Sequence, residues 1–168
     1  GGLEDLKKLQ INMIGNPYER FEEDPVRMIR AVRFKAKLNG SINSKLNNSI
    51  SKNAHLIANV PPARIYEEVI KLFHNESSLF VFRELSNLGI LKYLFPHTQE
   101  DAFISASLIN TSERIKSGNS VTPAFLFAVF LWSAQNMRFN EINKKKTSRI
   151  ELMIKASEDV IRRQVQQV

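Results

Sequence analysis

Two side chains near the start of the chain could read a nucleobase. Asp24 and Arg27 lie three residues apart at the start of an expected helix, so they occupy neighbouring positions on one face. A carboxylate acceptor beside a guanidinium donor complements the edge of adenine or cytosine, whereas guanine and uracil present the reverse order. A mismatched base would leave buried polar groups unpaired, at a cost of about 1–3 kcal/mol each. The pair could therefore select A or C. In the alternative interpretation, Asp24 is only a helix cap with a salt bridge to Arg27.

The charge around this pair is one-sided. Residues 25–66 contain no Asp or Glu, and their basic side chains give a local charge of +8, above the net charge of +7 for all 168 residues. These side chains are Arg27, Arg30, Arg33, Lys35, Lys37, Lys45, Lys52 and Arg64. Clustered positive charge attracts nucleotide phosphates or a nucleic-acid backbone. A solvated face would explain any one lysine, but it explains a stretch of this length less well.

Composition excludes several other kinds of site. The chain has no Cys, which removes disulfides, thiolate metal sites and cysteine nucleophiles. The consecutive acids Glu22, Glu23 and Asp24 lie at a helix start, where the helix dipole stabilises them and where they do not converge on one ion. The histidines at 55, 74 and 97 show no ligand spacing, so we expect no metal site. No apolar run approaches the roughly 18 residues of a membrane span, and the first residues lack the layout of a signal peptide. We therefore expect a cytoplasmic protein without membrane contact.

Apolar spacing predicts an all-α fold, because no segment shows sustained two-residue alternation. Expected helices cover about 3–13, where the end is frayed or extended, 24–38, one or two short pieces within 41–58, 62–73, 77–87, 100–116, 123–135 and 141–168. The helix that begins at 123 is apolar almost all round, which predicts a central core helix. Short connections favour antiparallel packing in a multi-helix bundle.

The helix over 24–38 has two distinct faces. Met28, Ile29 and Val32 form an apolar stripe with Ala36, whereas the arginines at 30 and 33 fill a different arc with Lys37. Asp24 and Pro25 predict its start, and Asn39-Gly40 predicts its end. Such a helix packs on one side and presents guanidinium groups on the other.

Several motifs resemble the neck and body of bacterial poly(A) polymerases. They are RFEEDPVRMIRAVRF at residues 20–34, Pro-Pro-Ala-Arg-Ile-Tyr-Glu-Glu at 61–68 and Leu-Gly-Ile-Leu-Lys-Tyr-Leu-Phe-Pro at 88–96. This family belongs, with the CCA-adding tRNA nucleotidyltransferases, to the class II group of the polymerase-β superfamily. The resemblance runs from the first residue to about residue 96 and continues more loosely around residues 122–128.

The resemblance implies roles for individual residues. Asp24 and Arg27 would read the incoming base, and Arg30 and Arg33 would lie near the nucleotide or brace its pocket. Arg64 and Glu68 match an element that supports the base-reading helix. Glu68 could pair with an arginine across the neck, or with Arg64 one turn earlier as an ordinary surface pair.

The resemblance also implies what the chain lacks. In this family a β-sheet head holds two metal ions on an Asp-x-Asp pair, which is absent here. We therefore expect a neck-and-body fragment that is inactive alone, with residues 1–96 as neck and start of the body and 97–168 as an RNA-binding body truncated at its C-terminus.

Three functions remain open at this stage. The first is a polynucleotide adenylyltransferase that uses ATP and Mg²⁺ in the full-length enzyme to extend RNA 3′ ends in mRNA processing, with neither ligand bound by this fragment. The second is a CCA-adding tRNA nucleotidyltransferase, because the base-reading argument does not separate A from C. The third is a non-catalytic helical RNA-binding module.

Overall fold

The computed structural model describes residues 2–142 and 149–166, and these form an all-α protein with one small parallel strand pair. Its elements are α1 (Gly2–Lys7), β1 (Gln10–Ile11), α2 (Pro17–Glu23), α3 (Val26–Leu38), β2 (Ser41–Ile42), α4 (Ser44–Asn53), the 3₁₀ helix η1 (Ala54–Asn59), α5 (Pro62–Phe73), α6 (Ser78–Asn87), α7 (Leu91–Leu94), α8 (Ala102–Lys116), α9 (Pro123–Ile142) and α10 (Arg149–Gln166). The expected all-α fold class is confirmed. None of the described helices is long and apolar enough to cross a membrane.

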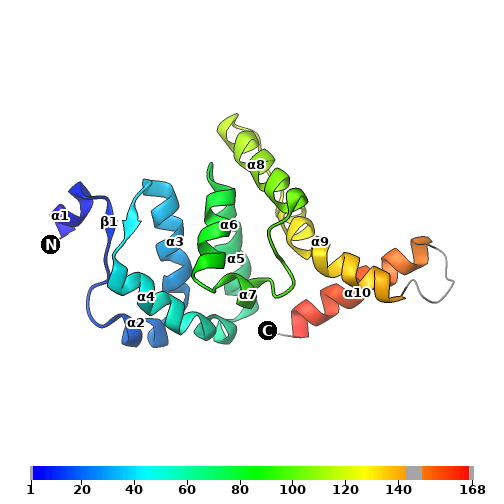
Figure 1. Cartoon of the computed structure of the whole chain (residues 1–168), viewed down its shortest axis with the longest axis horizontal. Coiled ribbons are helices and arrows are strands. Elements are labelled where there is room, and N and C mark those ends of the chain that lie inside the picture. The colour runs from blue at the N-terminus through cyan, green and yellow to red at the C-terminus, as the bar shows by residue number, and fades with distance from the viewer. Residues whose placement is uncertain (1, 143–148, 167–168) are drawn as a thin grey trace.

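Helix α3 lies at the centre of the N-terminal half and packs against α5 and α6 (Figure 1). Met28, Ile29 and Val32 are fully buried, as the apolar stripe predicts. Asn39 ends the helix in the left-handed conformation, with φ 47° and ψ 40°. The helix starts at Val26, two residues after Asp24, whose carboxylate accepts the Val26 N–H.

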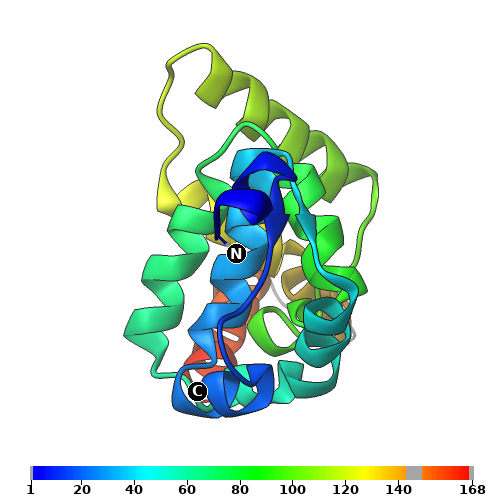
Figure 2. The same cartoon turned by 90° about the vertical axis from the view of Figure 1, so that its left-hand side faces the viewer.

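The first segment, expected over residues 3–13 as a short helix with a frayed or extended end, has that form. The structure has a helix over Gly2–Lys7, after which Leu9 adopts a positive φ of 48° and the chain extends into β1. Strand β1 pairs in parallel with β2, so the segments before α2 and after α3 lie side by side (Figure 2). Long-range pairing of two-residue strands leaves no periodic signal in a sequence.

The C-terminal helices α9 and α10 form an antiparallel pair that extends away from the N-terminal half of the chain (Figure 1). Leu126, Val129 and Phe130 of α9 are buried, but Phe125 and Trp132 each keep 40% of their surface exposed. The expected all-round burial of this helix is therefore wrong, because α9 packs on only part of its circumference. It also runs to Ile142, beyond the expected end near residue 135.

Candidate nucleotide-binding site

The candidate site lies where α2, α3 and α5 meet. The link between α2 and α3 is Asp24-Pro25, and the extended backbone of Asp24 turns its side chain toward α5. One carboxylate oxygen of Asp24 accepts from the Val26 N–H at 3.2 Å, and the other accepts from Arg64 Nη2 at 2.8 Å. Asp24 is thus both a cap-like acceptor at the start of α3 and a tie to α5.

Arg27 points in the other direction, back to α2. Its Nη1 donates to the carbonyl oxygen of Arg20 and to Glu23 Oε2, each at 2.8 Å. In the part of the chain that the structure describes, the side chains of Asp24 and Arg27 form no ion pair with each other, so the salt bridge expected between them is wrong. The physical reason is competition: Glu23 at the end of α2 binds Arg27, and Arg64 reaches Asp24 from α5.

Glu68 is the central carboxylate of the site. It is 3% exposed on α5, and α3 supplies both of its closest partners. Arg30 donates from Nη2 and Nε to Oε1 at 2.9 and 3.3 Å, and Arg33 Nη1 donates to Oε2 at 3.1 Å. The expected pair between Glu68 and an arginine across the neck is confirmed, and two arginines share it.

Electrostatics keep this carboxylate ionised. Burial on its own raises the pKa of Glu68, but the hydrogen bond and charge of Arg30, with the charges of Arg33 and Lys71, outweigh it and lower the pKa overall. The hydrogen bond to Glu68 in turn raises the pKa of Arg30. A buried carboxylate that holds two arginines of one helix fixes the direction of both side chains.

Acceptors within the protein occupy only some of the N–H donors of the arginines at this site. The side chains of Arg27, Arg30 and Arg64 are 36%, 40% and 45% exposed. Each guanidinium has five N–H groups, and the hydrogen bonds on α2, α3 and α5 occupy one or two of them. The remaining donors suit phosphate or the acceptor atoms of a base.

Sequence reasoning missed two of the contacts that arrange this site. It treated Glu23 only as a residue stabilised by the helix dipole, although its spacing to Arg27 is that of a helical ion pair. It also gave no partner to Asp24 beyond Arg27, whereas Arg64 lies 40 residues further on. The first contact has a sequence signal, and the second becomes visible only in three dimensions.

The carboxylates of the site do not fit a catalytic metal. Asp24, Glu23 and Glu68 each bind an arginine. Across residues 2–142 and 149–166, no group of three or more acidic or histidine side chains is arranged to hold an ion. The site is therefore suited to bind anions and polar edges and not to activate a water through a metal.

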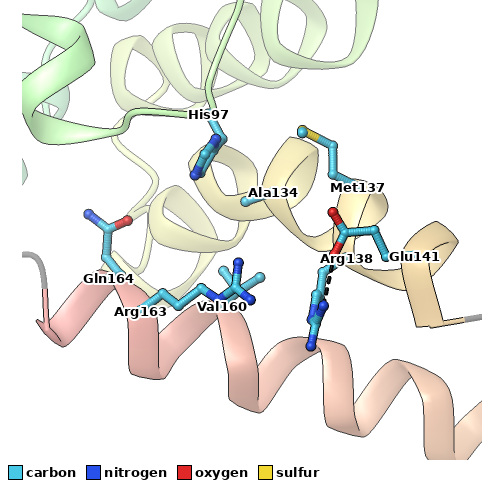
Figure 3. Close-up of a pocket in the computed structure, with 8 residues that line it drawn as sticks. All are labelled: His97, Ala134, Met137, Arg138, Glu141, Val160, Arg163 and Gln164. Carbon is cyan, nitrogen blue, oxygen red and sulfur yellow. Dashed lines mark hydrogen bonds and ion pairs between the residues drawn. The ribbon is translucent and has the colours of Figure 1, made fainter.

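A second hollow, of about 100 Å³, lies between α9 and α10 below His97 (Figure 3). Arg138 on its edge is bound by Asp159 at 2.8 Å and by Glu141 at 2.8 Å, so its charge is balanced. The sequence also has a basic run, Lys144-Lys145-Lys146, which lies outside the described residues. The hollow is too small for a nucleotide.

Together the fold and the site define an all-α protein with a braced arginine-rich helix pair suited to phosphates and bases. Residues 41–101 match the family described as "Probable RNA and SrmB- binding site of polymerase A". Poly(A) polymerase I of Haemophilus influenzae is 38% identical over 141 residues, or 78% of this chain and 31% of that protein. The CCA-adding enzyme of Limosilactobacillus reuteri is 38% identical over 108 residues, or 64% of this chain and 27% of that protein.

The fold is also shared with a solved structure. The Thermotoga maritima CCA-adding enzyme complexed with tRNA aligns with a TM-score of 0.57 and 14% identity, over 99% of this chain and 53% of that one. The chain is therefore related in sequence to bacterial poly(A) polymerase I and to the CCA-adding enzymes. It spans about 30% of the length of the poly(A) polymerases that it matches.

Proposed function

We propose that the chain is part of a template-independent polynucleotide adenylyltransferase, which transfers AMP from ATP to the 3′ end of RNA and releases pyrophosphate. The observation that carries this proposal is the length of chain over which the similarity extends. The match to poly(A) polymerase I extends over 141 residues, against 108 for the CCA-adding enzyme. We assign the protein to RNA processing in the cytoplasm on the same grounds.

Asp24 and Arg27 would read the base in this proposal. Because they do not pair with each other, each keeps capacity for a ligand. An ionised carboxylate has about four lone-pair sites, and Asp24 uses one toward Val26 and one toward Arg64. Arg27 uses only Nη1, which leaves Nε and Nη2 as donors. The acceptor and the donor therefore remain available to the amino group and the ring nitrogen of adenine.

Arg30 and Arg33 would bring positive charge close to the nucleotide, while Glu68 holds their direction. Arg64 would hold the Asp24 carboxylate in place. Pre-positioned groups avoid part of the ordering cost of binding, which is the advantage of this bracing. A Mg²⁺ ion would have to be held by other parts of the intact protein, because the carboxylates here are bound by arginines.

The division of labour along the chain is also part of the proposal. Residues 1–96, which contain all six residues of the site, would recognise the nucleotide. Residues 97–168 would contact RNA away from the reaction. The hydrophobic core crosses residue 96, so this division is one of function and not of packing.

The test uses protein expressed from the complete gene, incubated with each nucleoside triphosphate and either a generic RNA or a tRNA that lacks its 3′ end. We expect long A tails on the generic RNA. A single CCA end restricted to tRNA would support the second candidate, the CCA-adding enzyme, which its own 38% identity favours. Tight RNA binding with no nucleotide incorporated on either substrate would instead support a non-catalytic RNA-binding module.

A further inference from the structure

A groove lies at the opposite end of α3 from the base-reading pair. It has a volume of about 770 Å³ and is formed by the last turns of α3 and α5, the turn that follows α5, and Ile115 of α8. Ten residues separate Arg27 from Lys37, so the far end of the groove lies about 15 Å further along the helix axis. It is thus a separate surface on the same helix.

The groove is positively charged, and its charges are incompletely used. Lys37 is exposed and has no hydrogen bond or ion pair within the described ranges. Lys71 approaches Glu67 and Glu68 only at 3.6 and 3.7 Å, at the long limit of an ion pair. Arg33 adds a third cation to the lining, against a single carboxylate at Glu76. A lone surface lysine is ordinarily solvated, but cations from two helices that converge on one groove attract an anionic chain.

The same groove offers a platform for a base. Phe34 lines it and keeps 44% of its surface exposed, so its side chain is accessible to a ligand in the groove. The guanidinium carbon of Arg33 lies 5.4 Å from the centre of this ring, so a cation already sits beside it. Ala36, Ile70 and Ile115 are half-buried and add apolar surface.

We propose that this groove binds single-stranded RNA, with one base stacked on Phe34 and neighbouring phosphates on Lys37 and Lys71. An aromatic face beside a track of cations is how proteins hold single strands without reading their sequence. The groove volume lies within the range of pockets that hold ligands of nucleotide size. The proposal rests on the proposed function for its ligand. It places that ligand on two residues of α3, Phe34 and Lys37, which lie outside the matched region 41–101, and on Lys71 within it.

The test measures RNA binding without ATP, so it does not depend on catalysis. A fluorescent twelve-nucleotide oligoadenylate is titrated with the full-length protein, and its anisotropy gives Kd. We expect Phe34→Ala to weaken binding by about tenfold, within the range for a lost base–aromatic stack. Lys37→Glu should weaken binding by a similar factor at low salt, and it should reduce the slope of log K against log salt by roughly 0.7.

The matched control is Lys7→Glu, which makes the same charge change at an exposed lysine of α1, outside the groove and outside the matched region 41–101. It should change Kd by less than about twofold, because its lysine would touch no phosphate. Equal effects of Lys37→Glu and Lys7→Glu would overturn the proposal, since general charge would then explain both. An RNA Kd that is unchanged in both Phe34→Ala and Lys37→Glu would also overturn the proposal. This includes the case in which only the KM for ATP changes.

A second measurement uses the unaltered protein. Oligoadenylate with one 4-thiouridine is cross-linked by light, and the modified peptides are identified by mass spectrometry. Cross-links within residues 33–37 or 70–77 support the proposal, and cross-links confined to other segments contradict it. If the groove binds RNA but the protein adds no nucleotide, the proposed function fails while this inference stands.

Discussion

Glu68 shows how one carboxylate can arrange two cations at the scale of single residues. Its oxygens are divided between Arg30 and Arg33, and its own surface is 3% exposed. When one partner of a buried ion pair is removed, the charge of the remaining partner stays buried and unpaired. This loss of stability is larger than the contribution of the intact pair. Because the side chains of both arginines are partly exposed, water can solvate part of their charge. The loss of stability therefore lies toward the lower end of the range for buried ion pairs.

We expect Glu68→Gln to lower the free energy of unfolding by about 2 kcal/mol at neutral pH, the range for hydrogen bonds to charged groups. The pKa of Glu68 is lower in the folded protein than its ordinary value, so its stabilising contribution is complete above the unfolded value near 4.3 and is lost as pH falls through the folded value. The stability gap between wild type and variant should therefore be constant from about pH 5 to 7 and shrink below about pH 4. Urea unfolding at a series of pH values measures it, and a gap that stays constant at low pH contradicts it.

Arg27→Ala tests the base-reading assignment in the full-length protein. The Arg27 ion pair with Glu23 is exposed at the surface, so its loss should cost less than about 1 kcal/mol of stability. The preference for ATP over GTP and UTP should fall by about tenfold or more, since one polar atom of the base would lose its partner. Competition between labelled nucleotides gives the preference, and thermal unfolding gives the stability.

Arg20→Ala is the control for this variant. Arg20 also binds Glu23, at 2.9 Å, and is similarly exposed, but the proposal gives it no contact with the base. It should leave nucleotide preference unchanged. Should Arg27→Ala unfold the protein and spare the preference, Arg27 is a structural residue of the helix start.

At the scale of elements, the small β1–β2 pair depends on Gly40. The Ser41 N–H donates to the Leu9 carbonyl oxygen at 2.9 Å, and a Cβ on Gly40 would collide with that same oxygen. Backbone cannot move aside as a flexible side chain can. We expect Gly40→Ala to destabilise the protein by about 2 kcal/mol or more through this clash and the disturbed hydrogen bond.

Gly89→Ala is the comparison that separates a clash from backbone strain. Gly89 has a φ of +72° but no atom near the position of an added Cβ. Its substitution should cost about 1–2 kcal/mol from the left-handed conformation alone. Denaturant midpoints measure both variants, and amide hydrogen exchange at Ser41 should be faster in Gly40→Ala only.

Local signals in the sequence were sufficient for most helices. Pro62 opens α5, Asn39 closes α3, and apolar spacing gives their buried faces, because these features depend on neighbours within a few residues. The strand pair and the partial exposure of α9 were not predictable in this way. Both depend on what lies opposite in three dimensions, which a single sequence does not encode locally.

The candidate site was predicted as a set of residues but not as a set of contacts. The grouping of Asp24, Arg64 and Glu68 with the α3 arginines follows from the motif, and the structure brings all of them together. The pairing was wrong for Asp24, because a helix-start side chain on extended backbone can turn to either neighbour. Only the packing of α5 against α3 decides the choice.

At the scale of the whole molecule, one aromatic cluster joins the two halves of the chain. Phe130 of α9 lies with ring centres 4.6 Å from Phe73, 6.3 Å from Phe82 and 4.5 Å from Phe95. It is fully buried, and the backbone carbonyl of Phe130 also accepts a hydrogen bond from the hydroxyl of Thr98. Helix α9 and the helices of the N-terminal half therefore share one core.

A shared core predicts that the chain unfolds in one step. Trp132 is the one tryptophan of the sequence and lies on α9, so its fluorescence reports the C-terminal half, whereas far-ultraviolet circular dichroism reports all helices. The two urea midpoints should coincide. Phe130→Ala should lower the unfolding free energy by about 3–5 kcal/mol and shift both midpoints equally, while Phe125→Ala, at a ring that is 40% exposed, should cost about 1 kcal/mol or less. A fluorescence transition that precedes the dichroism transition would mean that the halves fold separately, and the arginine site would then not depend on α9.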